Sequence, residues 1–218
     1  IGDTSVGGNG IQITNTGNAR TVSLTGNIIK SVGNALVTTD TGTAGELLLS
    51  IDGNSFESTN SLAVNVTGSG LNSTIIQSMN GGTVVGNGLG GGALFQQVTF
   101  DASGTALSGS QVTAGNWTIG TTANRVSGDG LQIYDPTGDV AFDNLNVANN
   151  LGVGLTVNTK ALGTTFNLQT TGGTIDTTNG SALFLDPLST NIHFNTVSST
   201  GSFTNGATLD TVSGTVLI

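Results

Sequence analysis

The sequence predicts an all-β fold, a right-handed parallel β-helix (β-solenoid) of about eight coils of roughly 26 residues each. Three observations lead to this prediction. A phrase built from a small residue and an alternating apolar pair recurs along the chain. Apolar residues alternate with polar ones at the two-residue period of a strand, and glycine and asparagine follow the strands where a corner is needed. No window combines the 3.6-residue period of a helix with helix start and stop signals.

The first phrase supplies one lead residue per coil, as in residues 10–13 (GIQI) and 130–133 (GLQI). Successive lead residues are 25 and 26 positions apart early in the chain, and 24, 28 and 26 apart later. Because the coils of a solenoid stack on their neighbours, we expect the lead residues to form one inward stack. Its expected members are Ile11, Leu36, Leu62, Leu131, Leu155, Leu183 and Leu209.

A second phrase follows in each coil, an alternating strand that ends in a turn residue. Residues 26–27 and 53–54, both Gly-Asn, end two of these strands and lie 27 positions apart. Residues 143–144 (Asp-Asn) end a third. Glycine and asparagine accept positive φ with little strain, so we expect a sharp corner there in each coil. Right-handed winding is the usual sense of parallel crossovers.

The interval of 69 residues between Leu62 and Leu131 is too long for two coils and too short for three. We expect two coils and a loop insertion at about 104–124, within a single β-helix segment (1–218) of a longer protein. Trp117, the only tryptophan, lies in this expected loop. It is the candidate partner contact, because an exposed aromatic ring stacks well on a sugar or a protein. The alternative is that Trp117 covers a gap in the core.

Two other repeat architectures fit less well. Leucine-rich repeats have a period near 26, but their Leu-x-x-Leu-x-Leu-x-x-Asn phrase and their helical half are absent from the sequence. Propeller blades need about 40 to 50 residues. A regular Thr-x-Thr rank on one face would indicate ice binding, and residues 14–16 and 39–41 begin such a rank. The coil that follows Leu62 offers residues 66–68 (VTG), so we expect the rank to break there.

The composition narrows the classes of partner. Glycine, threonine, asparagine and serine supply 114 of the 218 residues, whereas 8% are charged and the formal net charge is −9. Four cationic residues cannot neutralise many phosphates, so we expect no nucleic acid partner. The chain has no cysteine, which excludes disulfides and cysteine metal sites. No apolar run approaches the roughly 18 residues of a membrane span, so we expect this segment to lie outside the membrane.

Candidate catalytic and metal-binding residues are few. Lyases that act on uronates need lysine or arginine, which are scarce here, whereas hydrolases need clustered carboxylates. Asp135, Asp139 and Asp143 are the one group of neighbouring acids, and they fit a hydrolase site, a calcium site or a solvated turn. The only histidine, His193, alternates with Ile192 and Phe194 and is expected to face solvent. We therefore expect no enzyme activity, no cofactor and no metal.

The chain resembles the passenger domains of bacterial autotransporters, the type V secretion adhesins. Gly-x-Leu-x-Ile phrases, Gly-Asn corners, faces rich in threonine, serine and asparagine, few charges and no cysteine carry this resemblance over essentially the whole chain. It implies a right-handed parallel β-helix displayed outside a bacterial cell, beyond the outer membrane, as a virulence-related surface protein. The expected function is adhesion to a host surface protein, matrix or glycan, or self-association. The alternatives are a polysaccharide-degrading β-helix hydrolase and a passive structural stalk.

Overall fold

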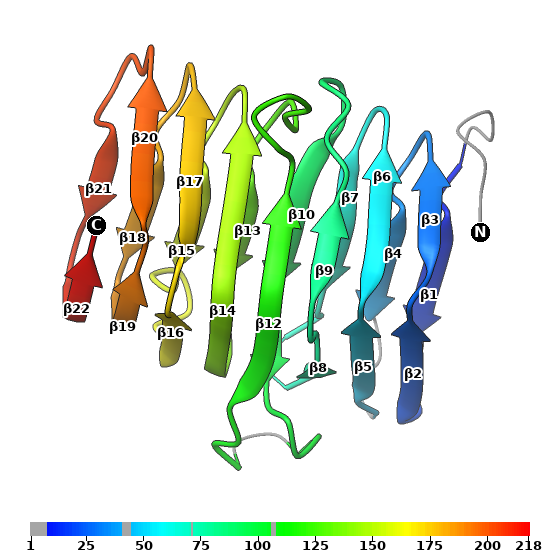
Figure 1. Cartoon of the computed structure of the whole chain (residues 1–218). Coiled ribbons are helices and arrows are strands. Elements are labelled where there is room, and N and C mark those ends of the chain that lie inside the picture. The colour runs from blue at the N-terminus through cyan, green and yellow to red at the C-terminus, as the bar shows by residue number, and fades with distance from the viewer. Residues whose placement is uncertain (1–7, 41–44, 71, 106–107) are drawn as a thin grey trace.

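The computed structural model describes residues 8–40, 45–70, 72–105 and 108–218, and throughout these ranges the chain is all-β, with 22 strands and no helix. The strands form a parallel β-solenoid of about seven turns, close to the eight coils predicted from the sequence (Figure 1). The predicted fold class is therefore confirmed.

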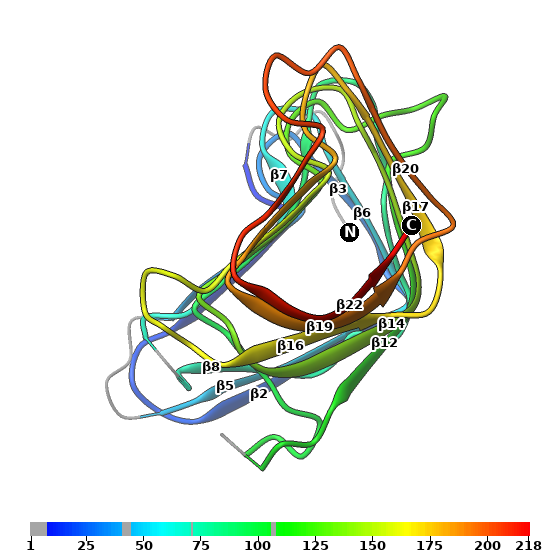
Figure 2. The ribbon, with the colours of Figure 1, turned by 90° about the vertical axis from the view of Figure 1, so that its left-hand side faces the viewer.

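Three faces surround the core, and they are visible when the solenoid is viewed along its axis (Figure 2). Face A comprises β1 (Ile11–Asn15), β4 (Leu36–Asp40), β7 (Leu62–Thr67), β10 (Gly91–Gln96), β13 (Leu131–Tyr134), β15 (Leu155–Asn158), β18 (Leu183–Asp186) and β21 (Ala207–Leu209). Face B comprises β2 (Arg20–Thr25), β5 (Leu47–Asp52), β8 (Thr74–Ser78), β11 (Thr99–Phe100), the first half of β14 (Thr137–Asn149), β16 (Phe166–Thr170), β19 (Leu188–His193) and β22 (Val212–Leu217). Face C comprises β3 (Ile28–Ser31), β6 (Asn54–Ser58), β9 (Gly82–Val84), β12 (Val112–Ile119), the second half of β14, β17 (Gly173–Thr178) and β20 (Thr196–Thr200).

The inward stack on face A exists, but two of its predicted members are wrong. Val64 pairs with Leu36 in the place predicted for Leu62, and Ala207 pairs with Leu183 in the place predicted for Leu209. Leu209 itself stacks on Leu185 and is 48% exposed. In coil order, the observed stack consists of Ile11, Leu36, Val64, Ala93, Leu131, Leu155, Leu183 and Ala207.

A column of small residues at the corner between faces C and A explains this register. The residue before each stack member is glycine or alanine: Gly10, Ala35, Ala63, Gly92, Gly130, Gly154, Ala182 and Gly206. Neighbouring backbones come so close here that a Cβ on Gly92 would lie 1.8 Å from the Gly130 carbonyl oxygen. The corner is occupied only by glycine or by fully buried alanine, whereas Leu62 follows Ser61, whose hydroxyl would be buried at this position.

The corrected register also sets the threonine rank on face A. Thr14, Thr39 and Thr67 pair in sequence across three coils, and this column of threonines ends at Gln96 in the fourth. The third coil reads Thr67-Gly68-Ser69, so the two-threonine Thr-x-Thr rank breaks in that coil, as the sequence predicted.

The corner between faces B and C forms where the Gly-Asn pairs predicted it. Gly26 and Gly53 have φ of +65° and +63°. The buried Asn54 amide oxygen accepts hydrogen bonds from the Asn27 backbone N–H (2.9 Å) and side-chain amide (3.0 Å), and Asn54 Nδ2 donates to the Leu24 carbonyl (2.7 Å). These amide ladders satisfy backbone groups that the bend removes from strand pairing.

The core is apolar along the length of the solenoid and includes a run of aromatic rings. Phe95 and Phe100 have ring centroids 5.8 Å apart, and Phe100 and Phe166 have centroids 5.5 Å apart. Inward residues of the first and last coils, such as Ile13 and Val216, are only partly buried. The best-packed part of the core therefore lies in the middle coils.

The predicted insertion at 104–124 has different bounds in the structure. Residues 112–119 form β12, a strand of the solenoid wall, and two 11-residue segments flank it. One runs from 101 to 111, of which 106–107 lie outside the described residues, and the other runs from 120 to 130. Both project from the cross-section in Figure 2. The insertion is therefore two separate projections with a core strand between them.

Trp117 lies in the core and not in a projecting loop. It is 0% exposed, its Nε1 donates to the Met79 carbonyl oxygen (2.7 Å), and it pairs with Gly82 on the neighbouring coil. The absence of a side chain at Gly82 leaves room for the indole ring. The candidate partner contact at Trp117 is thus contradicted by burial, and the alternative, that the ring fills a gap in the core, agrees with its position.

Candidate functional site

The three aspartates proposed as a hydrolase or calcium site lie apart from one another. Asp139 and Asp143 are both on β14, four residues apart, which corresponds to about 13 Å along a strand. Asp135 precedes them at the corner between faces A and B, where it is buried and has φ of +47°. Within the described ranges, no three His, Cys, Asp or Glu side chains are grouped so that they could hold a metal ion.

Asp135 anchors a neighbouring loop. Its Oδ1 accepts a hydrogen bond from the backbone N–H of Leu162 at 3.1 Å. Leu162 belongs to the segment 159–165, which connects β15 to β16. His193 is exposed on β19 between the buried Ile192 and Phe194, as the alternation predicted.

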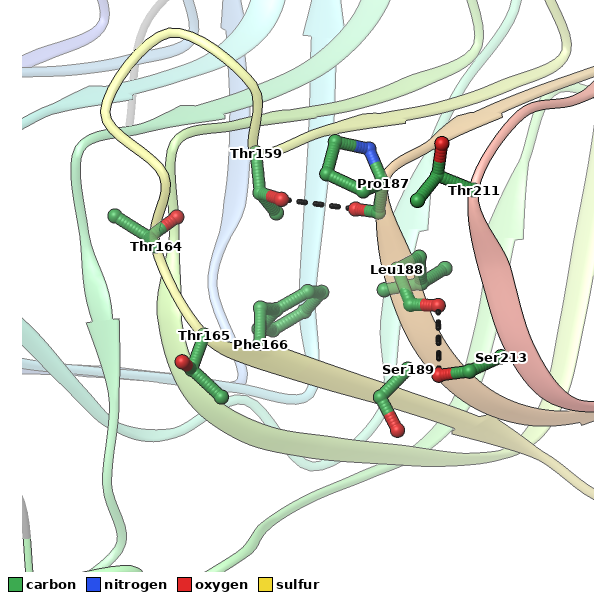
Figure 3. Close-up of a pocket in the computed structure, with 9 residues that line it drawn as sticks. All are labelled: Thr159, Thr164, Thr165, Phe166, Pro187, Leu188, Ser189, Thr211 and Ser213. Atoms are coloured by element: carbon green, nitrogen blue, oxygen red, sulfur yellow. Dashed lines mark hydrogen bonds between the residues drawn. The ribbon is translucent and has the colours of Figure 1, made fainter.

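Segment 159–165 is the longest A–B connection in the C-terminal half of the solenoid. The equivalent connections in the flanking coils contain only 135–136 and 187. The longer connection projects from the corner and leaves a hollow of about 230 Å³ between itself and the last two coils (Figure 3). We call this hollow the loop pocket. Its lining residues are Thr159, Thr164, Thr165, Phe166, Pro187, Leu188, Ser189, Thr211 and Ser213.

Contacts on both sides hold the loop in place. Thr159 Oγ1 donates to the Pro187 carbonyl oxygen (2.8 Å), and Lys160 Nζ lies 3.3 Å from Asp186 Oδ2 in an ion pair. Asp135 holds the opposite side through Leu162. Both the base of the loop, at Thr159, and its exposed tip at residues 160–163 are therefore held before any ligand arrives.

The lining of the loop pocket is uncharged and amphipathic. Pro187 is the partly exposed apolar residue of the lining, whereas Phe166 (2% exposed) and Leu188 (4% exposed) are buried in the core behind it, and hydroxyl-bearing side chains make up the rest. The Thr164 hydroxyl is buried and has no hydrogen-bond partner in the structure. Figure 3 shows this hydroxyl on the side of Thr164 that faces Thr159, with the methyl group pointing away. A buried hydroxyl without a partner costs free energy, so it marks a position where a hydrogen-bonding ligand would be favoured.

A second hollow, of about 300 Å³, lies on face C beside the projection 120–130. Thr118, Asn146, Thr174 and Asp176 line it. Arg125 ties the projection to the face, because its Nη2 pairs with Asp176 Oδ2 at 2.5 Å and its Nη1 donates to the Asp176 carbonyl at 2.6 Å. The Asp176 carboxylate is therefore already engaged by a cation from the same chain.

Face C carries a polar rank of hydroxyl and amide side chains, and face A carries another that consists of Thr14, Thr39, Thr67, Gln96, Tyr134, Asn158 and Asp186. The outward positions of face C in six successive coils are Ser55, Thr83, Thr118, Asn146, Thr174 and Thr196. Apolar residues also occupy outward positions on all three faces: Val37, Leu94 and Phe184 on face A, Leu48 and Ala141 on face B, and Ile28, which is 64% exposed and pairs with Ser55 at the start of the face C rank. At the strand spacing of about 4.8 Å, the six positions of face C span about 24 Å.

Asp101 organises the other projection, at 101–111. Its carboxylate is buried and accepts hydrogen bonds from the Ser103 hydroxyl (2.6 Å), the Ser108 hydroxyl (2.7 Å) and the Gly109 backbone N–H (3.1 Å). Burial acts to raise the pKa of Asp101, but the hydrogen bonds from Ser103 and Ser108 outweigh it and hold that pKa below its ordinary value. The carboxylate is thus committed to shaping the projection.

Comparison with known proteins adds no relative. No protein-family model, curated protein or solved structure matches the chain. The described residues contain no helix long and apolar enough to cross a membrane.

The spacing of the stack residues in the sequence contains a signal for the loop pocket, although no motif marks it. The stack residues Leu131 and Leu155 are 24 positions apart, whereas Leu155 and Leu183 are 28 apart. The four additional residues belong to the coil that contains 159–165. Coil length thus indicates which coil has an enlarged connection, but the hollow beside it depends on the neighbouring coils.

Proposed function

We propose that this chain is a segment of an extracellular β-solenoid, displayed on a bacterial cell surface, that mediates adhesion or self-association without catalysing a reaction. The regular polar rank of face C carries the proposal. Side chains in register at the strand spacing offer a repeated set of neutral donors and acceptors, which suits many weak contacts that add up by avidity. The resemblance to autotransporter passengers supports the location and the class of function.

Exposed apolar side chains beside face C also support a binding role. Leu89, Leu151 and Phe203 lie in turns that lead from face C to face A, and Phe203 is 96% exposed. Large apolar side chains at turn tips are suited to anchor a partner that the polar rank contacts more weakly. This surface would be the binding site for the partner, which is a host surface protein, matrix, a glycan or a second copy of the chain.

Two alternatives remain as competing proposals. A polysaccharide hydrolase would have to use carboxylates other than the trio at 135, 139 and 143, because these do not converge. A passive stalk would need neither the polar rank nor exposed apolar tips. The insertion carrying Trp117 no longer favours adhesion over a stalk, since the tryptophan is buried. The choice between adhesion and a stalk therefore depends on face C.

A charge-insertion experiment tests the proposal. The triple variant Thr83→Glu/Thr118→Glu/Thr174→Glu places like charges along the rank. We expect it to reduce both binding of the purified chain to matrix- and glycan-coated surfaces and its self-association in sedimentation velocity. The matched control is Asn191→Glu/Thr215→Glu on face B, where both side chains are exposed, with circular dichroism to confirm folding.

The outcomes separate the candidates. Loss in the face C variant with little change in the face B variant supports the proposal. Equal behaviour of both variants and the parent chain, with no binding in any of them, would favour the stalk. Release of reducing ends from a polysaccharide by the parent chain would favour the hydrolase.

A further inference from the structure

We infer that the loop pocket at 159–165 binds a neutral saccharide unit, an inference that rests on the proposed binding role and gives it a ligand class. The evidence is the combination of a partly exposed apolar contact at Pro187, several hydroxyl groups beside it, one buried hydroxyl without a partner and a lining without charge. A pyranose ring has both an apolar C–H face and outward hydroxyl groups, so it matches this lining on both counts.

The size of the pocket favours one sugar ring over a longer ligand. Its volume of about 230 Å³ is below the 300–1,000 Å³ typical of sites for drug-sized molecules. The base of the loop on one side and Pro187 with Thr211 on the other limit the length of the hollow (Figure 3). The pocket would therefore hold a single terminal or side-branch residue of a glycan.

Apolar and polar groups divide the recognition between them. Pro187 would face the C–H side of the ring, where burial of apolar surface contributes, because Phe166 and Leu188 are already buried in the core. Thr165, Ser189 and Ser213 present hydroxyls from the B-face side. Thr164 Oγ1 is shielded by the loop, so a ligand hydroxyl would reach it only when the Lys160–Asp186 ion pair and the hydrogen bond from the Leu162 N–H to Asp135 open.

Other ligand classes fit the same lining less well. A charged ligand would lose water without finding a countercharge in the pocket, and the net charge of −9 disfavours anions. A purely apolar ligand would leave the surrounding hydroxyls unpaired. A peptide cannot extend the sheet here, because β16 is already paired with β14 and β19 on its two sides.

The test measures binding of glucose, galactose, mannose and N-acetylglucosamine, and of their disaccharides, by saturation-transfer NMR and titration calorimetry. Thr164→Val keeps the shape of the side chain and removes the buried hydroxyl. We expect it to weaken saccharide binding about tenfold and to raise the unfolding midpoint slightly, because the unpaired hydroxyl is gone. Ser189→Trp fills the hollow from the outer surface of β19 and is expected to abolish binding.

The matched control is Thr196→Val, the same chemical change at an exposed position of face C. It should leave saccharide binding unchanged. Saccharide binding that is equally strong in the chain and in the Thr164→Val and Ser189→Trp variants would overturn the inference, as would no binding of any of these saccharides. Selection of a peptide from a random library by the same pocket would also overturn it.

The design separates this inference from the proposed function. If the face C triple variant loses attachment while no saccharide binds the loop pocket, the proposed function stands and this inference fails. If saccharides bind the loop pocket but the chain neither attaches nor self-associates, the ligand class is right and the adhesive role is wrong.

Discussion

Replacing Gly82 by alanine inserts a methyl group into the space that the Trp117 ring occupies. A Cβ at this position would lie 2.6 Å from both Cε2 and Cζ2 of the indole and 2.8 Å from Cη2. The ring cannot retreat easily, because it is fully buried and its Nε1 is bound to the Met79 carbonyl. Overpacking of this kind costs about 1–3 kcal/mol. For a chain of this length that corresponds to a fall of about 2–12 °C in the unfolding midpoint.

The assay compares Gly82→Ala with Gly128→Ala by thermal and urea unfolding, followed by circular dichroism. Gly128 has no neighbouring atom within 4 Å of its Cβ position and no positive φ. Its replacement should be neutral or should stabilise the chain by up to about 1 kcal/mol, since alanine restricts the unfolded state. The emission of Trp117, the sole tryptophan, gives a second signal for the Gly82→Ala variant.

A double-mutant cycle isolates the contact from other effects. Trp117→Leu is itself destabilising, but it removes the ring that the new methyl group meets. In the Trp117→Leu background, Gly82→Ala should lower the free energy of unfolding by less than it does in the parent chain, with a difference of about 1 kcal/mol or more. Equal stability of the Gly82→Ala and Gly128→Ala chains, or strict additivity in the cycle, would refute the packing described for Trp117.

The buried polar groups lead to two further predictions. Asp101→Asn should reduce stability by about 1–3 kcal/mol at pH 7. Because the folded pKa of Asp101 is lowered, its contribution is present above the unfolded value near pH 4 and is lost as the pH falls through the folded value. The two chains should therefore converge in acid urea titrations, and a constant difference down to pH 2 would contradict this. Asn149→Ala removes a fully buried amide that bonds to Gly128, Leu151 and Thr177, and should cost about 3 kcal/mol. Asn144 is exposed, so Asn144→Ala should lower the free energy of unfolding by less than about 1 kcal/mol. If calorimetry gave equal losses for Asn149→Ala and Asn144→Ala, burial would not be the cause of the larger loss expected at Asn149.

The candidate sites show where sequence reasoning reached its limit. Trp117 was predicted to lie in a loop, either as a partner contact or covering a gap in the core, because residues 104–124 interrupt the repeat. The interruption consists of two projections with a core strand between them. Burial of the ring depends on Gly82, one coil earlier, and that contact could not be recognised before the coils were aligned. Asp135 lies at a corner as predicted, but it is buried and not solvated, because it accepts a hydrogen bond from the Leu162 N–H, a contact that depends on the path of a loop in the next coil.

The sequence by itself determined the class of fold and most of the inward and outward assignments. Two-residue alternation is a local property of a strand, so residues such as Ile192, His193 and Phe194 could be assigned without knowing their neighbours. The Gly-Asn corners were also local, since they depend on backbone preferences at one position.

Only the tertiary structure decided how the coils align, and with that which residues share a site. Leu62 and Val64 have the same parity in their strand, so alternation cannot choose between them, and the apolar pattern favours the larger side chain. The choice falls to Val64 because the residue before it, Ala63, is small and apolar, whereas Ser61 would bury its hydroxyl at the corner where adjacent backbones nearly touch. That close approach is a contact between residues about one coil apart in the chain, and it exists only once the solenoid has wound.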